Sequence, residues 1–150
     1  MISGLVGLKG KPVLIGGLKE ERWKVKAFEF TENGELVGER ELAEGIALTA
    51  ARMDGKIILG GYKGSDLWVR SEGWEVTLPN GAVTSLLPIG EDLLVGGEVK
   101  GKAAVIKVRN GEILWEKELW ERGWVEVLGE EIAAGVKEEE GKTVMVVERI

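Results

Sequence analysis

The sequence predicts an all-β protein built from four repeats of about 40 residues. Two observations carry this prediction. An apolar triplet followed by glycine recurs along the chain, and every copy lies among short alternating segments and glycine turns that are typical of β-strands joined by hairpins. Helix signals are nearly absent. The four copies are Val13–Gly17, Ile57–Gly61, Leu93–Gly97 and the degenerate Ile132–Gly135.

The spacing of the copies indicates the architecture. Gly16, Gly60, Gly96 and Gly135 are separated by 44, 36 and 39 residues, which is close to the period of a four-stranded propeller blade. We therefore expect one domain, a β-propeller-like array of four blades. A β-sandwich or barrel with the same hairpins is the alternative fold. The expected domain spans residues 1–150, with repeats at about 1–42, 43–78, 79–119 and 120–150.

Each repeat begins with a short apolar strand and a tight turn. The turns contain glycine in every copy, as in Lys9-Gly10-Lys11 and Asp54-Gly55-Lys56. Asp-Gly favours a two-residue hairpin because both central residues need a positive φ. The apolar triplet then forms the second strand. The expected first strands are 4–8, 46–53, 83–89 and 124–128.

After the triplet we expect a charged loop, a third strand, another glycine turn such as Asn110-Gly111, and a fourth strand. The third strands are expected at 23–30, 66–70, 103–109 and 143–149. The fourth strands end at Leu42, Leu78 and Leu119. Counting back four residues from these leucines gives Gly38, Trp74 and Trp115, and each is followed by glutamate. One register therefore aligns three repeats.

The fourth repeat has no fourth strand within the sequence. Its third strand, 143–150, is therefore expected to be an exposed apolar edge, and such an edge invites pairing with another chain. Two arrangements remain open. The four blades form a compact ring, or a partial ring is completed by a second copy of the chain, which makes a homo-oligomer through 143–150.

Composition excludes several kinds of chemistry. The chain has no cysteine and no histidine, so disulfides, thiolate nucleophiles, Ser-His-Asp triads and imidazole metal ligands are ruled out. The formal net charge is −6 with no basic face, which makes nucleic acid a poor partner. The 23 Glu and 13 Lys, with few Asn, Gln and Met, are typical of a hyperthermophile.

No apolar run reaches the length needed to span a bilayer. The segment Met1–Leu8 lacks the basic start of a signal peptide, and Lys9 and Lys11 follow it directly. The expected location is the cytoplasm, with no membrane partner.

The third repeat carries a family resemblance. The run Leu93–Gly97, followed by Ala104–Arg109, Asn110-Gly111 and Ile113–Leu119, resembles the quinoprotein (PQQ-like) and WD40-like β-propeller repeats. The resemblance covers nearly the whole chain at the level of the repeat and implies the fold only. None of the cofactor and calcium site residues of quinone-dependent dehydrogenases can be placed in this sequence, so neither a cofactor nor a metal is expected.

Glycines and two tryptophans recur in register, and we interpret them as structural. The Gly-Gly pairs allow bulges or close strand packing, although successive amides could also form an anion-binding nest. Trp74 and Trp115 are expected to pack between neighbouring blades. The glycine pairs are Gly16-Gly17, Gly60-Gly61 and Gly96-Gly97.

Aromatic residues that do not repeat are the candidate ligand-binding residues. Trp23, Tyr62, Trp120 and Trp124 lie at connections that the topology places on one face of the array. There they could stack on a sugar, a base or a peptide, or simply pack against the protein.

Three function classes follow from this reading. The leading hypothesis is a non-catalytic scaffold that binds a protein or peptide partner through the loop face or the edge strand. The second is a small-ligand or carbohydrate-binding module that uses the non-repeating aromatic residues. The third is a hydrolase or lyase based on carboxylates or Tyr62, and no catalytic residues are assigned for it. The acidic runs Glu130-Glu131 and Glu138–Glu140 are interpreted as solvated loops.

Overall fold

The computed structural model describes residues 1–8 and 10–150, and these residues form fifteen β-strands and no helix. The strands make four antiparallel sheets in which sequence neighbours pair. Sheet 1 contains β1 (Ile2–Leu8), β2 (Lys11–Lys19), β3 (Trp23–Phe30) and β4 (Leu36–Glu44). Sheet 2 contains β5 (Ile46–Met53), β6 (Lys56–Lys63), β7 (Asp66–Ser71) and β8 (Trp74–Leu78). Sheet 3 contains β9 (Gly81–Ile89), β10 (Asp92–Val99), β11 (Lys102–Arg109) and β12 (Glu112–Glu121). Sheet 4 contains β13 (Gly123–Leu128), β14 (Ile132–Glu139) and β15 (Lys142–Arg149).

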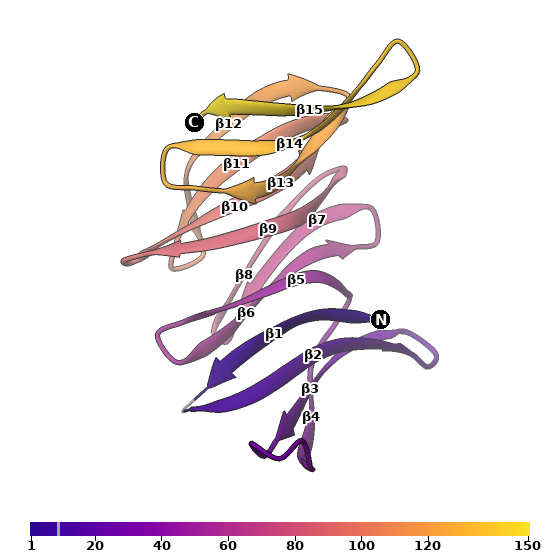
Figure 1. The fold of residues 1–150 in the computed structure, drawn as a ribbon, viewed down its shortest axis with the longest axis vertical. Coiled ribbons are helices and arrows are strands. Elements are labelled where there is room, and N and C mark those ends of the chain that lie inside the picture. The colour runs from indigo at the N-terminus through magenta and orange to yellow at the C-terminus, as the bar shows by residue number, and fades with distance from the viewer. Residues whose placement is uncertain (9) are drawn as a thin grey trace.

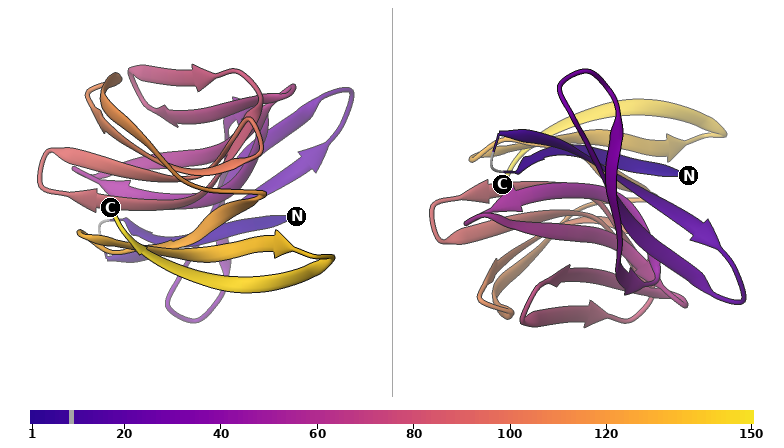
Figure 2. Two further views of the ribbon diagram at one scale, coloured as in Figure 1. Left: turned by 90° about the horizontal axis from the view of Figure 1, so that it is seen from above. Right: turned by 90° about the horizontal axis from the view of Figure 1, so that it is seen from below.

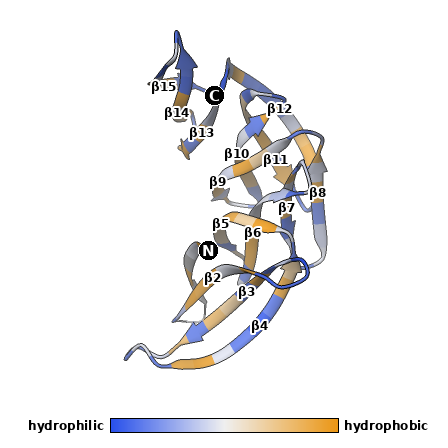
Figure 3. Cartoon of the chain, turned by 90° about the vertical axis from the view of Figure 1, so that its right-hand side faces the viewer, coloured by the Kyte–Doolittle hydropathy of each residue, from blue (hydrophilic) through white to orange (hydrophobic). Residues whose placement is uncertain are grey.

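The prediction of an all-β chain with four hairpin-joined sheets is confirmed, including the three-stranded last sheet. The sheets follow one another along the long axis of the molecule, with sheet 1 at one end and sheet 4 at the other (Figure 1). Views along this axis show the sheets lying over one another (Figure 2). From the side they form an open arc, and sheets 1 and 4 do not meet to close a ring (Figure 3).

The hairpin turns have the expected chemistry. Asp54 and Gly55 both have positive φ, and so do Asn110 and Gly111, as a two-residue primed turn requires. The predicted turn at Lys9–Lys11 lies partly outside the described residues. The charged loops expected after the triplets are mostly strand, because two-residue turns join β6 to β7, β10 to β11, and β14 to β15. The glycines of those turns, Gly64, Gly101 and Gly141, have positive φ.

A β-bulge occurs at the same place in the first strand of every sheet. Opposite the residue just before the bulge lies a glycine of the second strand: Gly16, Gly61, Gly97 or Gly135. This pairing corrects the sequence alignment, which matched Gly16 and Gly135 to the first glycine of each pair instead of the second. The reason is space at the bulge. A β-carbon on Gly97 would lie 2.0 Å from the Ala82 carbonyl oxygen.

Neighbouring sheets pack through the first strand of the later sheet. β5 packs against β1, β2 and β3; β9 packs against β5, β6 and β7; and β13 packs against β9, β10 and β11. Three apolar cores result, one at each junction. The leucines used to align the fourth strands each pack on the core that faces the next sheet. They are Leu42, Leu78 and Leu119.

Two bulged residues also tie sheets together by hydrogen bonds. The Ser3 hydroxyl donates to the Ala47 carbonyl, and the Thr84 hydroxyl donates to the Val125 carbonyl. Ser3 and Thr84 occupy equivalent bulge positions in sheets 1 and 3, and their acceptors occupy equivalent positions in sheets 2 and 4. The bulge therefore both curves the strand and aims a side chain at the next sheet.

Candidate functional site

A hollow of about 370 Å³ lies at the junction of sheets 1 and 2, and it contains two of the four predicted ligand-binding residues. Trp23 and Tyr62 both line it, and both are half-buried. The sequence places these residues 39 positions apart, and the stacking of the sheets brings them together. The remaining lining residues are Arg22, Glu44, Gly45, Ile46, Lys63 and Gly64.

The hollow is built by the single-residue connection between the two sheets. Gly45 joins β4 to β5 with φ +140°, a conformation that strongly favours glycine. Its N–H donates to the Trp23 carbonyl at 2.9 Å. A β-carbon on Gly45 would lie 3.0 Å from the fully buried ring of Trp68. The connection at the hollow is thus held against both sheets.

Charged side chains border the hollow on one side. Arg22 and Glu44 form an ion pair of 3.2 Å, and these two residues also line an adjoining charged hollow of about 400 Å³. Lys24 borders that second hollow, and Glu41 and Glu20 raise its pKa through hydrogen bonds and charge attraction. The surface beside Trp23 and Tyr62 therefore offers a guanidinium, an ammonium and carboxylates next to aromatic rings.

The other two predicted ligand-binding residues lie at the far end of the array. Trp120 is buried between sheets 3 and 4, and its Nε1–H donates to the Val136 carbonyl at 2.9 Å. For Trp120 the burial agrees with the alternative that the ring packs against the protein, and it leaves the ring no open face for a ligand. Gly123 and Gly135 leave the room for it, since β-carbons there would approach the ring to 2.7 and 3.0 Å. Trp124 is exposed and donates its indole N–H to Glu126.

The two tryptophans that repeat in register differ in burial. Strand pairing places Gly38, Trp74 and Trp115 at the same position of the fourth strand. Trp74 packs on the core between sheets 2 and 3, beside Gly111. Trp115 is 37% exposed, in contrast to the expected packing between blades. Trp74 contacts Gly111 in the turn between the third and fourth strands of sheet 3, and the described residues of sheet 4 include no fourth strand and so no equivalent turn to cover Trp115.

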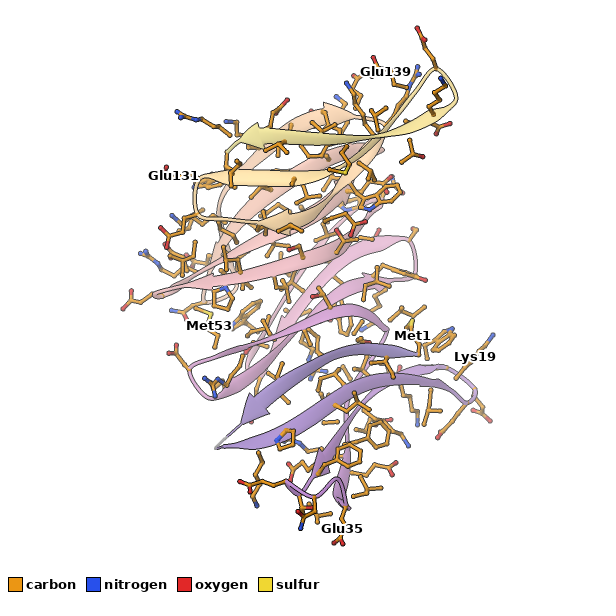
Figure 4. All side chains as sticks on the ribbon, viewed as in Figure 1. Met1, Lys19, Glu35, Met53, Glu131 and Glu139 are labelled. Atoms are coloured by element: carbon orange, nitrogen blue, oxygen red, sulfur yellow. The ribbon has the colours of Figure 1, made fainter. Side chains whose placement is uncertain are left out.

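Sheet 4 presents a second candidate surface, comprising a free edge and an outer face. Within residues 1–8 and 10–150, β15 pairs only with β14, as expected for an edge at 143–150, and the hairpin carrying Glu139 projects from the sheet (Figure 4). The outer face is apolar, which the sequence analysis did not identify. Aligning β15 with the third strands of the other repeats would have revealed it. Two cross-strand rows form the face: Val127, Ala134 and Val147, and Trp124, Val136 and Met145.

Acidic residues are involved in surface ion pairs. Arg109 and Lys107 contact Asp92 at 2.6 and 3.4 Å, and the hydrogen bond from Arg109 is the main reason that the Asp92 pKa lies below its usual value. Within residues 1–8 and 10–150, acidic side chains do not gather in groups of three or more that could hold a metal ion. The same residues include no helix that could cross a membrane.

Comparison with known proteins gives no family assignment: no protein-family model and no curated protein matches the chain.

Proposed function

We propose that the four sheets are blades of an open β-propeller-type array and that the protein is a non-catalytic scaffold for a protein or peptide partner. The period of about 40 residues and the order of strands within each sheet support the propeller assignment. The partner would bind in an extended conformation and add a strand to the free edge of sheet 4.

The free edge of β15 is the observation that carries this proposal. In sheets 1 to 3 the third strand pairs with a fourth strand, as β11 pairs with β12. β15 occupies the position of β11, and the part of the chain that the structure describes places no such strand at its outer edge. Strand addition supplies affinity through main-chain hydrogen bonds and specificity through alternate side chains.

A peptide copied from the chain itself tests strand addition. A synthetic peptide with the sequence of residues 112–121, which form β12, should protect alternate backbone amides of β15 from hydrogen exchange. The physical reason is that β15 offers the peptide the same type of edge that β11 offers β12. The measurement is residue-resolved exchange at increasing peptide concentration.

The control is the same peptide with the proline substitution Leu114→Pro and N-methylated alternate amides, which removes ladder donors. Equal protection by the control peptide, or no protection of β15 by the parent peptide at millimolar concentration, would contradict strand addition.

The hollow at Trp23 and Tyr62 favours a second function, binding of a small ligand such as a carbohydrate. Two aromatic faces beside an Arg22–Glu44 ion pair combine a stacking surface with hydrogen-bonding groups, a combination suited to sugars. A glycan panel should therefore quench tryptophan fluorescence in the wild type and not in Trp23→Ala, whereas Trp115→Ala, which changes an exposed tryptophan outside the hollow, should keep the response. A flat response of the wild type to the panel would exclude this function.

A further inference from the structure

Among the described residues, the outer face of sheet 4 is the one surface of the type that faces the next sheet and has no sheet packed on it. Strand pairing identifies three equivalent residues in each sheet. One lies on the second strand, three positions before the glycine that faces the bulge. The other two lie on the third strand, immediately before and after the residue that pairs with this glycine. In sheets 1, 2 and 3 these residues face the next sheet and are at most 2% exposed. They are Val13, Val25 and Ala27; Ile58, Leu67 and Val69; Leu94, Ala103 and Val105.

Sheet 4 has apolar residues at the same three positions, and they are exposed. Ile132 is 47% exposed, Met145 is 86% exposed and Val147 is 60% exposed. Burying such a patch against another apolar surface would remove it from water, which is favourable. Sheet 4 therefore has the same three apolar residues that sheets 1 to 3 bury at the internal junctions, on a face that no sheet covers among the described residues.

The opposite end of the array carries the matching strand. At each internal junction, the residue before the bulge of the later sheet is buried against the earlier sheet. These residues are Ala47, Val83 and Val125. Ile2 holds the same position in β1 of sheet 1 and is 73% exposed. β1 therefore presents to solvent the residue type and position that β5, β9 and β13 bury.

The two ends also match in side-chain size. Val83 and Val125 lie over glycines, because β-carbons on Gly60 and Gly96 would come within 2.5 and 2.8 Å of them. The position equivalent to these glycines is Ala134 in sheet 4. If the two ends meet, the small residue Ala134 would lie against the larger residue Ile2. The same combination of a small and a larger residue occurs at the junctions between sheets 2 and 3 and between sheets 3 and 4.

The outer side of sheet 1 also carries charged residues on its third and fourth strands. Lys24 and Lys26 pair with Glu39 and Glu41 across β3 and β4, and these strands lie in the half of the sheet away from β1. At the internal junctions the position of Lys26 is held by the buried residues Trp68 and Ala104, which pack on the core shared with the preceding sheet. Docking of β1 would therefore also cover the Lys26–Glu39 pair, and the desolvation of this pair opposes the gain from burying the apolar residues.

From these observations we infer that two copies of the chain associate head to tail, with β1 of each copy packed across β13, β14 and β15 of the other, and close a ring of eight sheets. The four sheets form an open arc (Figure 3). Two such arcs give eight blades, a number within the usual range for closed propellers. The inference concerns the face of sheet 4 and is independent of strand addition at its edge.

Oligomeric state is the first test. Light scattering should give twice the 16.3 kDa mass of the chain for the wild type, and the single mass for Val147→Glu and for Ile2→Glu. The matched control is Val37→Glu, because Val37 on β4 is 56% exposed and lies outside both surfaces; it should remain a dimer. A monomeric wild type, or loss of the dimer in the Val37 control as well, would overturn the inference.

Engineered disulfides test the orientation in folded protein. The chain lacks cysteine, so the double variant Ile2→Cys/Ala134→Cys carries only the two designed thiols. Oxidation should yield a covalent dimer from the double variant and from an equimolar mixture of the two single variants, and none from either single variant alone. Cross-linking of Ala134→Cys with itself would indicate a face-to-face dimer, and a ladder of higher multiples from the double variant would indicate an open filament; either result overturns the ring.

Discussion

At the scale of single residues, glycine is required opposite the bulges because the backbone of the first strand approaches closely, and not because of turn geometry. Gly61, Gly97 and Gly135 face carbonyl oxygens of the first strand, at 1.9, 2.0 and 2.1 Å from where a β-carbon would lie. Real β-carbons do not approach carbonyls so closely, so any side chain would push the two strands apart. The recurring glycine seen in the sequence therefore marks the bulge itself.

Gly97→Ala should destabilise the protein by about 3 kcal/mol, since the added methyl group collides with a backbone oxygen that cannot rotate away. The measurement is the free energy of unfolding from denaturant titration. The control is Gly7→Ala, because a β-carbon on Gly7 meets nothing within 4 Å, and its effect should stay within about 0.5 kcal/mol. Equal effects of the two substitutions would show that the close approach at Gly97 relaxes without cost.

At the scale of elements, the first strand of each sheet does more than the others. It pairs with the second strand and carries the bulge, and in sheets 2 to 4 it also packs across three strands of the preceding sheet. In two sheets the bulged residue also donates a hydroxyl hydrogen bond to the following sheet, from Ser3 and from Thr84. In sheets 2 and 4 the bulged residues are Leu48 and Glu126, so this hydrogen bond alternates along the array.

Thr84→Val should lower the free energy of unfolding by about 1 kcal/mol, because it removes the donor to the Val125 carbonyl while keeping the side-chain shape. Thr77→Val is the control, since Thr77 is exposed on β8 and should change stability by less than about 0.5 kcal/mol. Equilibrium unfolding monitored by tryptophan fluorescence measures both. A Thr84 variant as stable as the wild type would argue that the sheets are held by apolar packing alone.

At the scale of the whole molecule, the repeats made the strands and sheets predictable from the sequence. They did not predict whether the sheets close into a ring. Period-two alternation and glycine turns are local signals, and they located the strands and the four sheets correctly. The register of bulges depends on pairing across strands, so the alignment was wrong by one residue at Gly16 and Gly135. How far successive sheets rotate depends on many small packing contacts, and no residue pattern in the sequence reports that rotation.

The candidate site was only partly predictable for the same reason. Residue type identified Trp23 and Tyr62 as aromatic residues near connections, and the stacking of sheets 1 and 2 placed them around one hollow. Residue type alone did not distinguish them from Trp120, which is buried by its position over two glycines. Burial of this kind is a property of the neighbouring sheet and is absent from the local sequence.

Because every junction joins a first strand to the three strands before it, the interchangeable unit of this protein runs from one first strand to the next. Duplication or loss of one such unit, for example 81–122, would leave matching surfaces on both sides of the cut. The number of sheets thus depends on how many such units the chain contains. An array of this kind can gain or lose a sheet in evolution and keep the same type of junction between sheets.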